Sequence, residues 1–409
     1  MTEQPIKVAI VGCGAIAPTH ARAVTGLGAH VSALIDPDPA SAERLAEELT
    51  AASAPRPSVF SDLAAALADE AVDVVAVTNP TGAHVATAAE ALRAGKHVLV
   101  EKPLDVTLPA ALALDRTAAA AAENGVVASA VLQHRFDPSS ALVHQAIREG
   151  RLGRLTSAVA SVPWWRSQAY YDSADWRGTW AMDGGGAVLN QGIHTLDLLV
   201  WFLGAPSEIT AHIGRLAHTA IEVEDTAVAM IRFESGALAV LHASTAAHPG
   251  LLTRIEVMGD RGSAVIEQDR LAYFYEAARD HAAVGPLGLT GGRNQADEVL
   301  DPDENVLLPD PTDSAIGHAR QYADLLTAIR THRQPLVSVH DAIPSLATAH
   351  AIYAAGTLEH PVTFVDVLDG AYSDLAYRVT ETALRGPSPD RARNLGTTTA
   401  RARRHPHTS

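Results

Sequence analysis

Short apolar runs alternate with longer alanine-rich runs over the first 130 residues of the chain. Each short run is continuously apolar, which is typical of a parallel strand covered on both faces. The longer runs have the length and composition of helices. This alternation predicts an α/β fold with a doubly wound parallel sheet. The expected strands cover residues 6–11, 31–35, 74–77, 97–100 and 126–130, and the expected helices cover residues 15–26, 41–50, 83–94 and 109–124.

The pattern changes after residue 150. Residues 154–165 read as a strand that leaves the first unit, and six runs of alternating polarity follow between residues 209 and 275. Turn sequences such as ESG and GDRG separate these runs, which predicts an antiparallel meander. Residues 276–316 are rich in Gly, Pro and Asp and predict a long loop. A helix entered from the glycine triplet is expected at residues 188–203, and amphipathic helices are expected at residues 318–331 and 341–357.

Composition narrows the class of protein. Of 409 residues, 47% are hydrophobic and 19% are charged, which is ordinary for a globular protein. The net charge of −16 argues against nucleic acid and anionic membranes as partners. The single cysteine, Cys13, excludes an internal disulfide. No apolar run approaches the roughly 18 residues that span a bilayer, and the N-terminus lacks signal-peptide regions. A cytoplasmic protein is therefore expected.

The end of the first strand carries the sequence GCGAIA at residues 12–17. Gly12 would permit a tight turn, Gly14 would let the backbone approach a pyrophosphate, and Ala17 would allow close helix packing. Asp36 ends the second strand about 20 residues later, where a carboxylate accepts hydrogen bonds from ribose hydroxyls. Such a carboxylate repels a 2′-phosphate, which favours NAD over NADP. The alternative is that the glycines only form a turn and Asp36 only caps a helix.

Two further motifs follow strands at the same sheet edge. TNPTGAH covers residues 78–84, and EKP at residues 101–103 delivers a lysine to the edge where the nicotinamide is expected. The predicted cofactor-binding residues are Gly12, Gly14, Ala15, Ile16, Asp36, Asn79, Pro80, Glu101 and Lys102. No metal site is expected, because the histidines show no ligand spacing.

These motifs occur in order with GGGAVLNQGIHTLD at residues 184–197, QHRFDP at 133–138, and related stretches at 224–245, 254–274 and 317–330. Together they resemble the Gfo/Idh/MocA family, named after glucose–fructose oxidoreductase, inositol dehydrogenase and rhizopine catabolism. The resemblance implies an N-terminal Rossmann domain and a C-terminal α/β domain with a large open, mainly antiparallel sheet. It also implies pairing through that sheet into homodimers or homotetramers, and a cis peptide bond before Pro103.

The resulting division of the chain has three parts. Residues 1–130 are expected to form the NAD-binding Rossmann domain, and residues 131–370 the domain for substrate binding and oligomerisation. Residues 385–409 are basic and poor in apolar residues, and we expect them to be disordered.

The resemblance implies that Lys102 and His194 handle the hydroxyl proton of a substrate. Many relatives carry aspartate four residues before this histidine, whereas this chain carries Asn190, which cannot ionise. Three consequences are open: Asn190 orients substrate and leaves His194 as the sole base, Asp197 steadies His194 instead, or catalysis is impaired or repurposed. We favour the first, since histidine titrates near neutral pH unaided. The alternative for His194 is a satisfied core histidine.

The segment WWRSQAYYDSADWRGTWAMD at residues 164–183 concentrates aromatic and charged side chains before the glycine triplet. Aromatic faces stack on sugar C–H faces, and arginine and tyrosine bind hydroxyls. An equally weighted alternative is that the aromatic residues plug the domain interface. The predicted substrate-binding residues are Asn190, Arg166, Tyr170, Trp176, Arg177 and Trp180.

The sequence thus predicts an NAD-dependent oxidoreductase that acts on a secondary alcohol of a sugar, sugar derivative or cyclitol. Two alternatives from other classes stay open at this point. One is an NAD-dependent glycosidase, which oxidises, eliminates and reduces on one held cofactor. The other is a non-catalytic dinucleotide sensor. Reduction of a double bond or an imine is a weaker variant of the main prediction.

Overall fold

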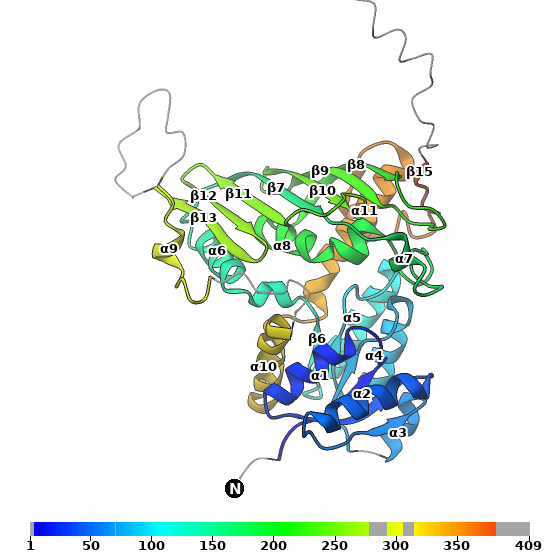
Figure 1. Cartoon of the computed structure of the whole chain (residues 1–409). Helices are drawn as coiled ribbons and strands as arrows, with labels where there is room; N and C mark the ends of the chain where they lie inside the picture. The colour runs from blue at the N-terminus through cyan, green and yellow to red at the C-terminus, as the bar shows by residue number, and fades with distance from the viewer. Residues whose placement is uncertain (1–3, 70, 278–292, 306–314, 382–409) are drawn as a thin grey trace, which may run out of the picture.

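The computed structural model describes residues 4–69, 71–277, 293–305 and 315–381. Its N-terminal part contains a six-stranded sheet in the order β3-β2-β1-β4-β5-β6, with every neighbouring pair parallel (Figure 1). The strands are β1 Lys7–Val11, β2 His30–Ile35, β3 Ser58–Phe60, β4 Val74–Val77, β5 His97–Val100 and β6 Ala128–Ala130. This order is that of a doubly wound dinucleotide-binding sheet, as the alternating pattern predicted.

The helices of this domain cover both faces of the sheet, so its strands are mainly apolar; every residue of β4 is buried. They are α1 Ala17–Gly26, α2 Pro39–Ala51, α3 Leu63–Asp69, α4 His84–Arg93 and α5 Leu108–Ala122. Short β3 and α3 were absent from the sequence prediction. With three and seven residues, they are too brief to show a periodic pattern.

The C-terminal part contains a nine-stranded sheet in the order β13-β12-β11-β7-β10-β9-β8-β14, with β15 also on β8. The strands are β7 Leu155–Pro163, β8 Pro206–Arg215, β9 Thr226–Phe233, β10 Leu238–Ser244, β11 Arg254–Gly259, β12 Gly262–Glu267, β13 Arg270–Glu276, β14 Val362–Thr363 and β15 Thr380–Glu381. Only the β7–β10 and β8–β15 pairs are parallel, so the predicted mainly antiparallel sheet is confirmed.

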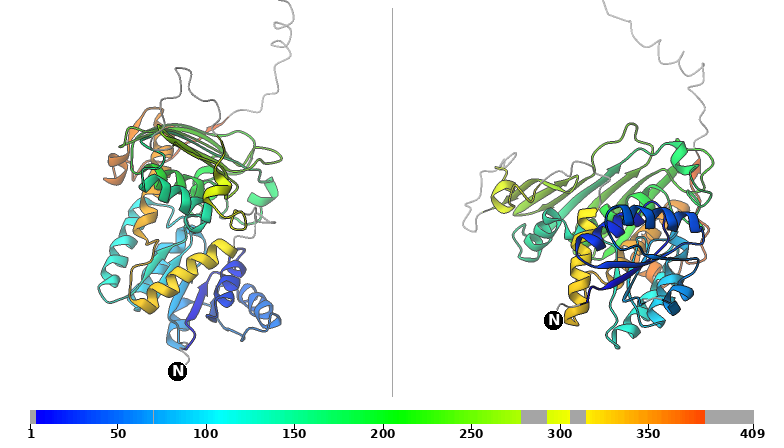
Figure 2. Two further views of the ribbon diagram at one scale, coloured as in Figure 1. Left: turned by 90° about the vertical axis from the view of Figure 1, so that its left-hand side faces the viewer. Right: turned by 60° about the horizontal axis from the view of Figure 1, so that its bottom comes forward.

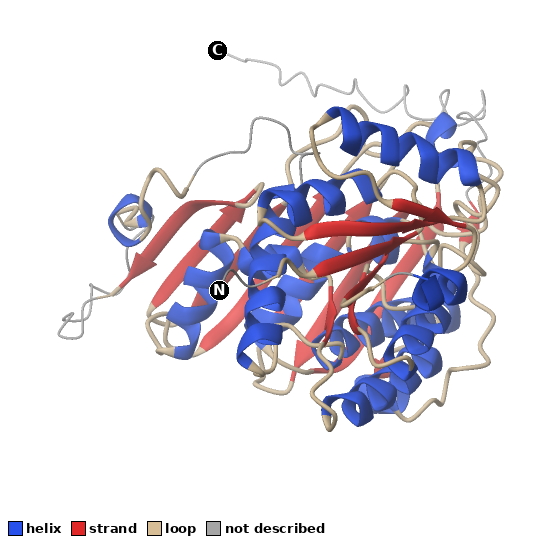
Figure 3. Cartoon of the chain, turned by 90° about the horizontal axis from the view of Figure 1, so that it is seen from below, coloured by secondary structure: helices blue, strands red, loops and turns tan. Residues whose placement is uncertain are grey.

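One face of this large sheet carries helices. The helices α6 Pro138–Arg148, α8 Ile193–Leu203 and α11 Ile343–Leu358 pack against it, between the sheet and the first domain (Figures 1 and 2). Seen from below, helices lie in front of the large sheet (Figure 3). Burial alternates along the central strands, with buried residues toward the helices and exposed ones on the other face.

Helix α10, Ala315–Thr331, comes late in the chain but packs against α1 of the first domain. Its Tyr322, Leu325 and Leu326 belong to one buried cluster with Val8 and Ile10 of β1. The first domain therefore completes its core with a segment from the far end of the chain.

The remaining segments are short or partly outside the described residues. Helix α7 covers Gln168–Tyr171 and α12 covers Phe364–Leu368, while α9, Ala296–Val299, lies within the expected loop at 276–316. The expected tail at 385–409 lies outside the described residues. Among the helices of the described ranges, none is long and apolar enough to cross a membrane.

Candidate active site

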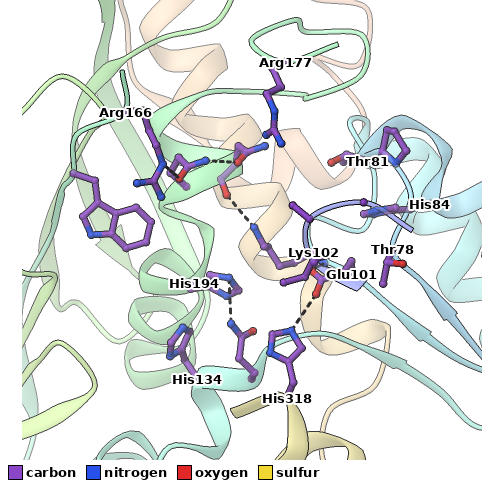
Figure 4. A pocket seen from close by; sticks show the side chains of 18 of the residues that line it. Thr78, Thr81, His84, Glu101, Lys102, His134, Arg166, Arg177, His194 and His318 are labelled. Carbon is purple, nitrogen blue, oxygen red and sulfur yellow. Dashed lines mark hydrogen bonds and ion pairs between the residues drawn. The ribbon is translucent and has the colours of Figure 1, made fainter. Parts of the chain in front are cut away.

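A cavity of about 1040 Å³ lies at the carboxyl edge of the first sheet, facing α8 of the second domain. Every predicted cofactor-binding residue lines it, and so do Lys102 and His194, which come from different domains (Figure 4). The structure thus brings the two predicted catalytic side chains to one cavity that is continuous with the glycine fingerprint.

The fingerprint end of the cavity fits a dinucleotide. Gly12 has a φ of 95°, and an added Cβ would lie 2.5 Å from the backbone of Asn79. Gly14 has nothing within 4 Å of an added Cβ, so its backbone is open to the cavity where a pyrophosphate must approach. Helix α1 begins without a side-chain cap, and its N-terminal end is free to face an anion. Asp36 accepts hydrogen bonds from the main-chain N–H groups of Cys13 and Asp38, both 2.8 Å away.

Lys102 reaches from the end of β5 to the second domain. Its Nζ donates a hydrogen bond to the main-chain oxygen of Asn190 at 3.0 Å. The Lys102–Pro103 peptide bond is cis, as the family resemblance implied. Burial lowers the pKa of the Lys102 ammonium group below its ordinary value.

Glu101 lies beside Lys102 and is held by two buried histidines. Its Oε1 lies 2.9 Å from His20 Nε2 and 3.1 Å from His318 Nε2, and its Oε2 accepts the main-chain N–H of Lys102. Burial alone would raise the pKa of Glu101, but the hydrogen bonds from His20 and His318 bring it well below its ordinary value. The carboxylate is therefore charged and engaged with the protein.

The turn before His194 differs from the single helix expected over residues 188–203. A π-helical turn covers Ala187–Gln191, and α8 begins only at Ile193. Glu224 explains this geometry, because its carboxylate accepts hydrogen bonds from the main-chain N–H groups of Gly186 and Val188. These bonds anchor the turn that carries Asn190 toward Lys102.

His194 has the environment of a neutral base. Its Nε2 lies 3.4 Å from Nε2 of Gln133, and its Nδ1 is buried without a protein hydrogen-bond partner. Its ring centroid is 4.9 Å from that of His134. Burial first, and then the positive charges of Lys102 and His134, lower the pKa of His194 well below 6.5. The imidazole is therefore neutral at neutral pH and can accept a proton.

The side chain of Asn190 faces a carboxylate that sequence reasoning missed. Its Nδ2 donates to Oδ1 of Asp183, and its Oδ1 accepts from Nε2 of Gln191. Burial raises the pKa of Asp183, against the hydrogen bonds from Gly178 and Asn190 that favour the charged form. No sequence signal marked Asp183, because it precedes the glycine triplet and reaches Asn190 only through the fold.

Asp197 does not steady His194. Both of its oxygens are engaged by the guanidinium group of Arg135, at 2.7 and 2.8 Å, and the Ser345 hydroxyl donates to it as well. The second of the three consequences considered for the asparagine at 190 is thus excluded by this buried ion pair.

Some of the predicted substrate-binding residues in the aromatic segment 164–183 line the cavity, and the others pack behind it or elsewhere. Arg166, Trp176 and Arg177 line the cavity, whereas Tyr170 and Trp180 do not. The Tyr170 hydroxyl supports the lining from behind, because it accepts hydrogen bonds from Arg177 and Gln191, both at 2.9 Å. Trp180 instead packs against the rings of Tyr353 and Tyr377 within the second domain, a packing role rather than a place on the cavity wall.

His134 and Gln133 line the cavity although neither was a predicted site residue. Nδ1 of His134 lies 2.7 Å from Asp137 and 3.1 Å from Asp269. Burial would lower the pKa of His134, but the two carboxylates outweigh it and raise the pKa well above 6.5. The QHRFDP motif was the available signal, since it stood among the family-like stretches without a role.

Two groups bring three potential metal ligands within 4.8 Å of one another among the described residues. They are His20 with Glu101 and His318, and His134 with Asp137 and Asp269. Within each group a carboxylate already accepts hydrogen bonds from the imidazoles, so the contacts are satisfied without an ion.

Comparison with known proteins agrees with this geometry. Residues 6–131 match the model of an oxidoreductase family with an NAD-binding Rossmann fold, and residues 141–265 match the model of the GFO/IDH/MocA C-terminal domain. The chain belongs to the Gfo/Idh/MocA family of oxidoreductases. The predicted family resemblance, oxidoreductase class and NAD-binding domain are thereby confirmed.

Several curated relatives of this Gfo/Idh/MocA protein are dehydrogenases of cyclitols or sugars. Myo-inositol dehydrogenase Hyg17 of Streptomyces leeuwenhoekii is 32% identical over 63% of this chain and 75% of its own length. The D-glucoside 3-dehydrogenase of Escherichia coli is 28% identical over 65% and 78%. The WlbA dehydrogenase of Bordetella pertussis, solved with NADH and UDP-GlcNAcA, superposes with a TM-score of 0.76 at 28% identity, over 89% of this chain and 99% of that one.

Proposed function

We propose that this protein transfers hydride between NAD and a secondary alcohol of a sugar, sugar derivative or cyclitol. The observation that carries the proposal is the meeting of Lys102 and His194 in the cavity that the glycine fingerprint also lines. A lysine and a neutral imidazole at one cavity are the proton-handling groups that alcohol oxidation requires. The names of the relatives, which include inositol and glucoside dehydrogenases, support the same substrate class.

NAD, which Gly12, Gly14 and Asp36 would hold, would supply the hydride acceptor of this reaction. His194 accepts the hydroxyl proton, because burial keeps its imidazole neutral. Lys102 donates a hydrogen bond to the oxygen that gains negative charge as the hydride leaves. The contact between Lys102 and the Asn190 main chain holds the ammonium group at the boundary of the two domains.

Asn190 then acts on the substrate by position rather than by ionisation. Because Asp183 can only accept hydrogen bonds when charged, it fixes the amide nitrogen of Asn190 toward itself. The amide oxygen is left on the other side, where it accepts from Gln191 and has a second lone pair for a substrate hydroxyl.

The experiment that tests this proposal is a panel of inositols, aldoses and nucleotide sugars incubated with NAD, with NADH formation followed by absorbance. We expect NADH to form with at least one member of the panel. Release of free sugar from a glycoside without net NADH would identify the glycosidase alternative instead. Tight NAD binding without turnover of any member would identify the sensor.

We further propose that two copies pair through the face of the large sheet that carries no helices. Val159, Val240 and Met230 lie side by side across β7, β10 and β9, and their exposed fractions are 40%, 40% and 61%. A row of exposed apolar side chains on a flat sheet is typical of an interaction surface. A second copy of the same sheet would cover it.

A further inference from the structure

The substrate end of the cavity concentrates positive charge in a chain that is strongly acidic overall. Lys102, Arg166 and Arg177 all line it, and Figure 4 shows the two arginines on either side of the turn that Lys102 contacts. Burial, with the charge of Arg166 as a further contribution, lowers the pKa of Lys102, so Arg166 is near enough to act on the lysine.

The two arginines share one aromatic neighbour. The guanidinium carbon of Arg166 lies 5.6 Å from the ring centroid of Tyr170, and that of Arg177 lies 4.5 Å from the same centroid. Within the described residues neither guanidinium group has a carboxylate oxygen within the 4.0 Å of an ion pair. A guanidinium group without an ion-pair partner keeps N–H donors available to an anion.

Neutral groups hold both guanidinium groups in place. Arg166 donates from Nε to Oε1 of Gln191 at 3.0 Å and from Nη1 to the main-chain oxygen of Trp165 at 3.3 Å. Arg177 donates from Nη1 to the Tyr170 hydroxyl at 2.9 Å, while its Nε is buried without a protein partner. A buried, unpaired N–H donor of this kind costs free energy unless a ligand satisfies it.

The carboxylates nearby are engaged elsewhere. Asp183 accepts hydrogen bonds from the main-chain N–H of Gly178 and from the amide of Asn190. Glu101 accepts from two histidines. The charge of Asp183 acts on Arg177, but neither arginine forms an ion pair with a carboxylate of the described residues.

We infer that the substrate carries an oxyanion, a carboxylate or a phosphate, that Arg166 and Arg177 bind while the reacting alcohol lies at Lys102 and His194. Guanidinium groups match either oxyanion with paired N–H donors. The inference rests on the proposed function, because it assigns this end of the cavity to substrate. The pyrophosphate of the dinucleotide has its own place beside Gly14, on the other domain.

The test measures sugar binding to the NADH-loaded full-length protein by calorimetry, independently of turnover. Matched probes are D-glucuronate against D-glucose, D-galacturonate against D-galactose, and glucose 6-phosphate against glucose. We expect at least one acidic sugar to bind roughly tenfold or more tightly than its neutral counterpart, as charge-assisted hydrogen bonds require. The uronate and phosphate arms identify which oxyanion the site takes.

The same measurements on Arg166→Gln and Arg177→Gln show whether these residues cause the preference. We expect each variant to lose most of it, while Arg154→Gln, an exposed arginine on the second domain, retains it. Unchanged NAD affinity and thermal stability show that the variants fold. The inference is overturned if no acidic sugar is preferred, if the preference survives both substitutions, or if the variants lose NAD affinity instead.

Turnover measurements on the same sugars test the proposed function separately from the oxyanion inference. If acidic sugars bind preferentially but no sugar of the panel reduces NAD, the oxyanion site stands and the dehydrogenase proposal falls. If neutral sugars reduce NAD as well as acidic ones, the dehydrogenase proposal stands and the oxyanion inference falls.

Discussion

The Lys102 ammonium group donates a hydrogen bond to the main-chain oxygen of Asn190 and thereby joins the EKP motif of the first domain to the turn that presents His194 from the second. This contact crosses the boundary between the two halves of the chain. It fixes the separation of the two groups that the proposed mechanism requires at one alcohol.

Substitution of either group tests its role in catalysis. We expect Lys102→Gln and His194→Gln each to lower turnover about 100-fold or more while NAD still binds, because each removes a contact made to the developing alkoxide or its proton. Lys96→Gln, a lysine away from the cavity, is the matched control and should keep full turnover. Near-normal turnover in either cavity variant removes that residue from the mechanism.

The pH dependence of kcat/KM separates the two groups. Burial and the charges of Lys102 and His134 lower the pKa of His194 well below 6.5, so the neutral base is lost only below that pH. Burial lowers the pKa of Lys102 below 10.5, so its positive charge and the activity decline before that pH. We expect kcat/KM to be highest between these two limbs.

The pH profile of kcat/KM for a Lys102 variant shows which of the two groups causes each decline in activity. Lys102→Arg should remove the alkaline limb, since arginine stays charged, and should leave the acid limb in place. An acid limb above pH 6.5 in the parent enzyme would contradict the buried, neutral state of His194.

Gln133 should position His194, since its Nε2 lies 3.4 Å from the imidazole Nε2. We expect Gln133→Glu to move the acid limb upward by about one pH unit, because a carboxylate beside imidazole favours the protonated form. Gln334→Glu, on an exposed loop, is the control for added charge. A merely structural role for Gln133 would lower stability but leave the limb unmoved.

The hydrogen bond from Asn190 to Asp183 explains why this chain has asparagine, and not aspartate, at position 190. Asn190→Asp would place a second carboxylate against a buried one, and we expect it to lower the free energy of unfolding by about 1–3 kcal/mol at neutral pH. The double variant Asp183→Asn/Asn190→Asp restores one amide and one carboxylate and should recover part of the loss. Urea denaturation of the parent, the single variants Asn190→Asp and Asp183→Asn, and the double variant measures this. Equal stability of the single Asn190→Asp and double variants would refute the pairing.

Met230→Glu tests the proposed sheet-to-sheet pairing. A charge at the most exposed residue of the apolar row should convert the oligomer to a smaller species, because a buried interface does not tolerate an unpaired carboxylate. Sedimentation velocity measures the change, with Leu336→Glu, an exposed leucine in a loop, as the control. If the parent protein sediments as a monomer, the proposed pairing is wrong.

The sequence predicted most of the fold because its signals were local. Continuous apolar runs marked the central parallel strands, and alternating runs marked the second sheet, as at β9. The short strand β3 was not predicted, because three residues are too few to show a periodic pattern. The π-helical turn before α8 was not predicted either, because the carboxylate of Glu224, which lies on a distant loop, shapes that turn.

The site was predictable where it coincided with motifs at strand ends. Gly12, Gly14, Asp36 and Lys102 reach the cavity because parallel strands deliver their carboxyl ends to one edge. Contacts between distant segments carried no such signal. Asp183 meets Asn190 only through the folded turn, and His134 gains its charge from a carboxylate, Asp269, that lies 135 residues further along the chain.

The return of α10 to the nucleotide-binding half has a consequence for protein engineering. A fragment cut after β6 would leave the α1 side of its core exposed, and Glu101 would lose the imidazole of His318. Chimeras that exchange cofactor specificity among relatives therefore need three splice points, one after β6 and one on each side of α10. A single crossover would produce mismatched halves, however well each half is chosen.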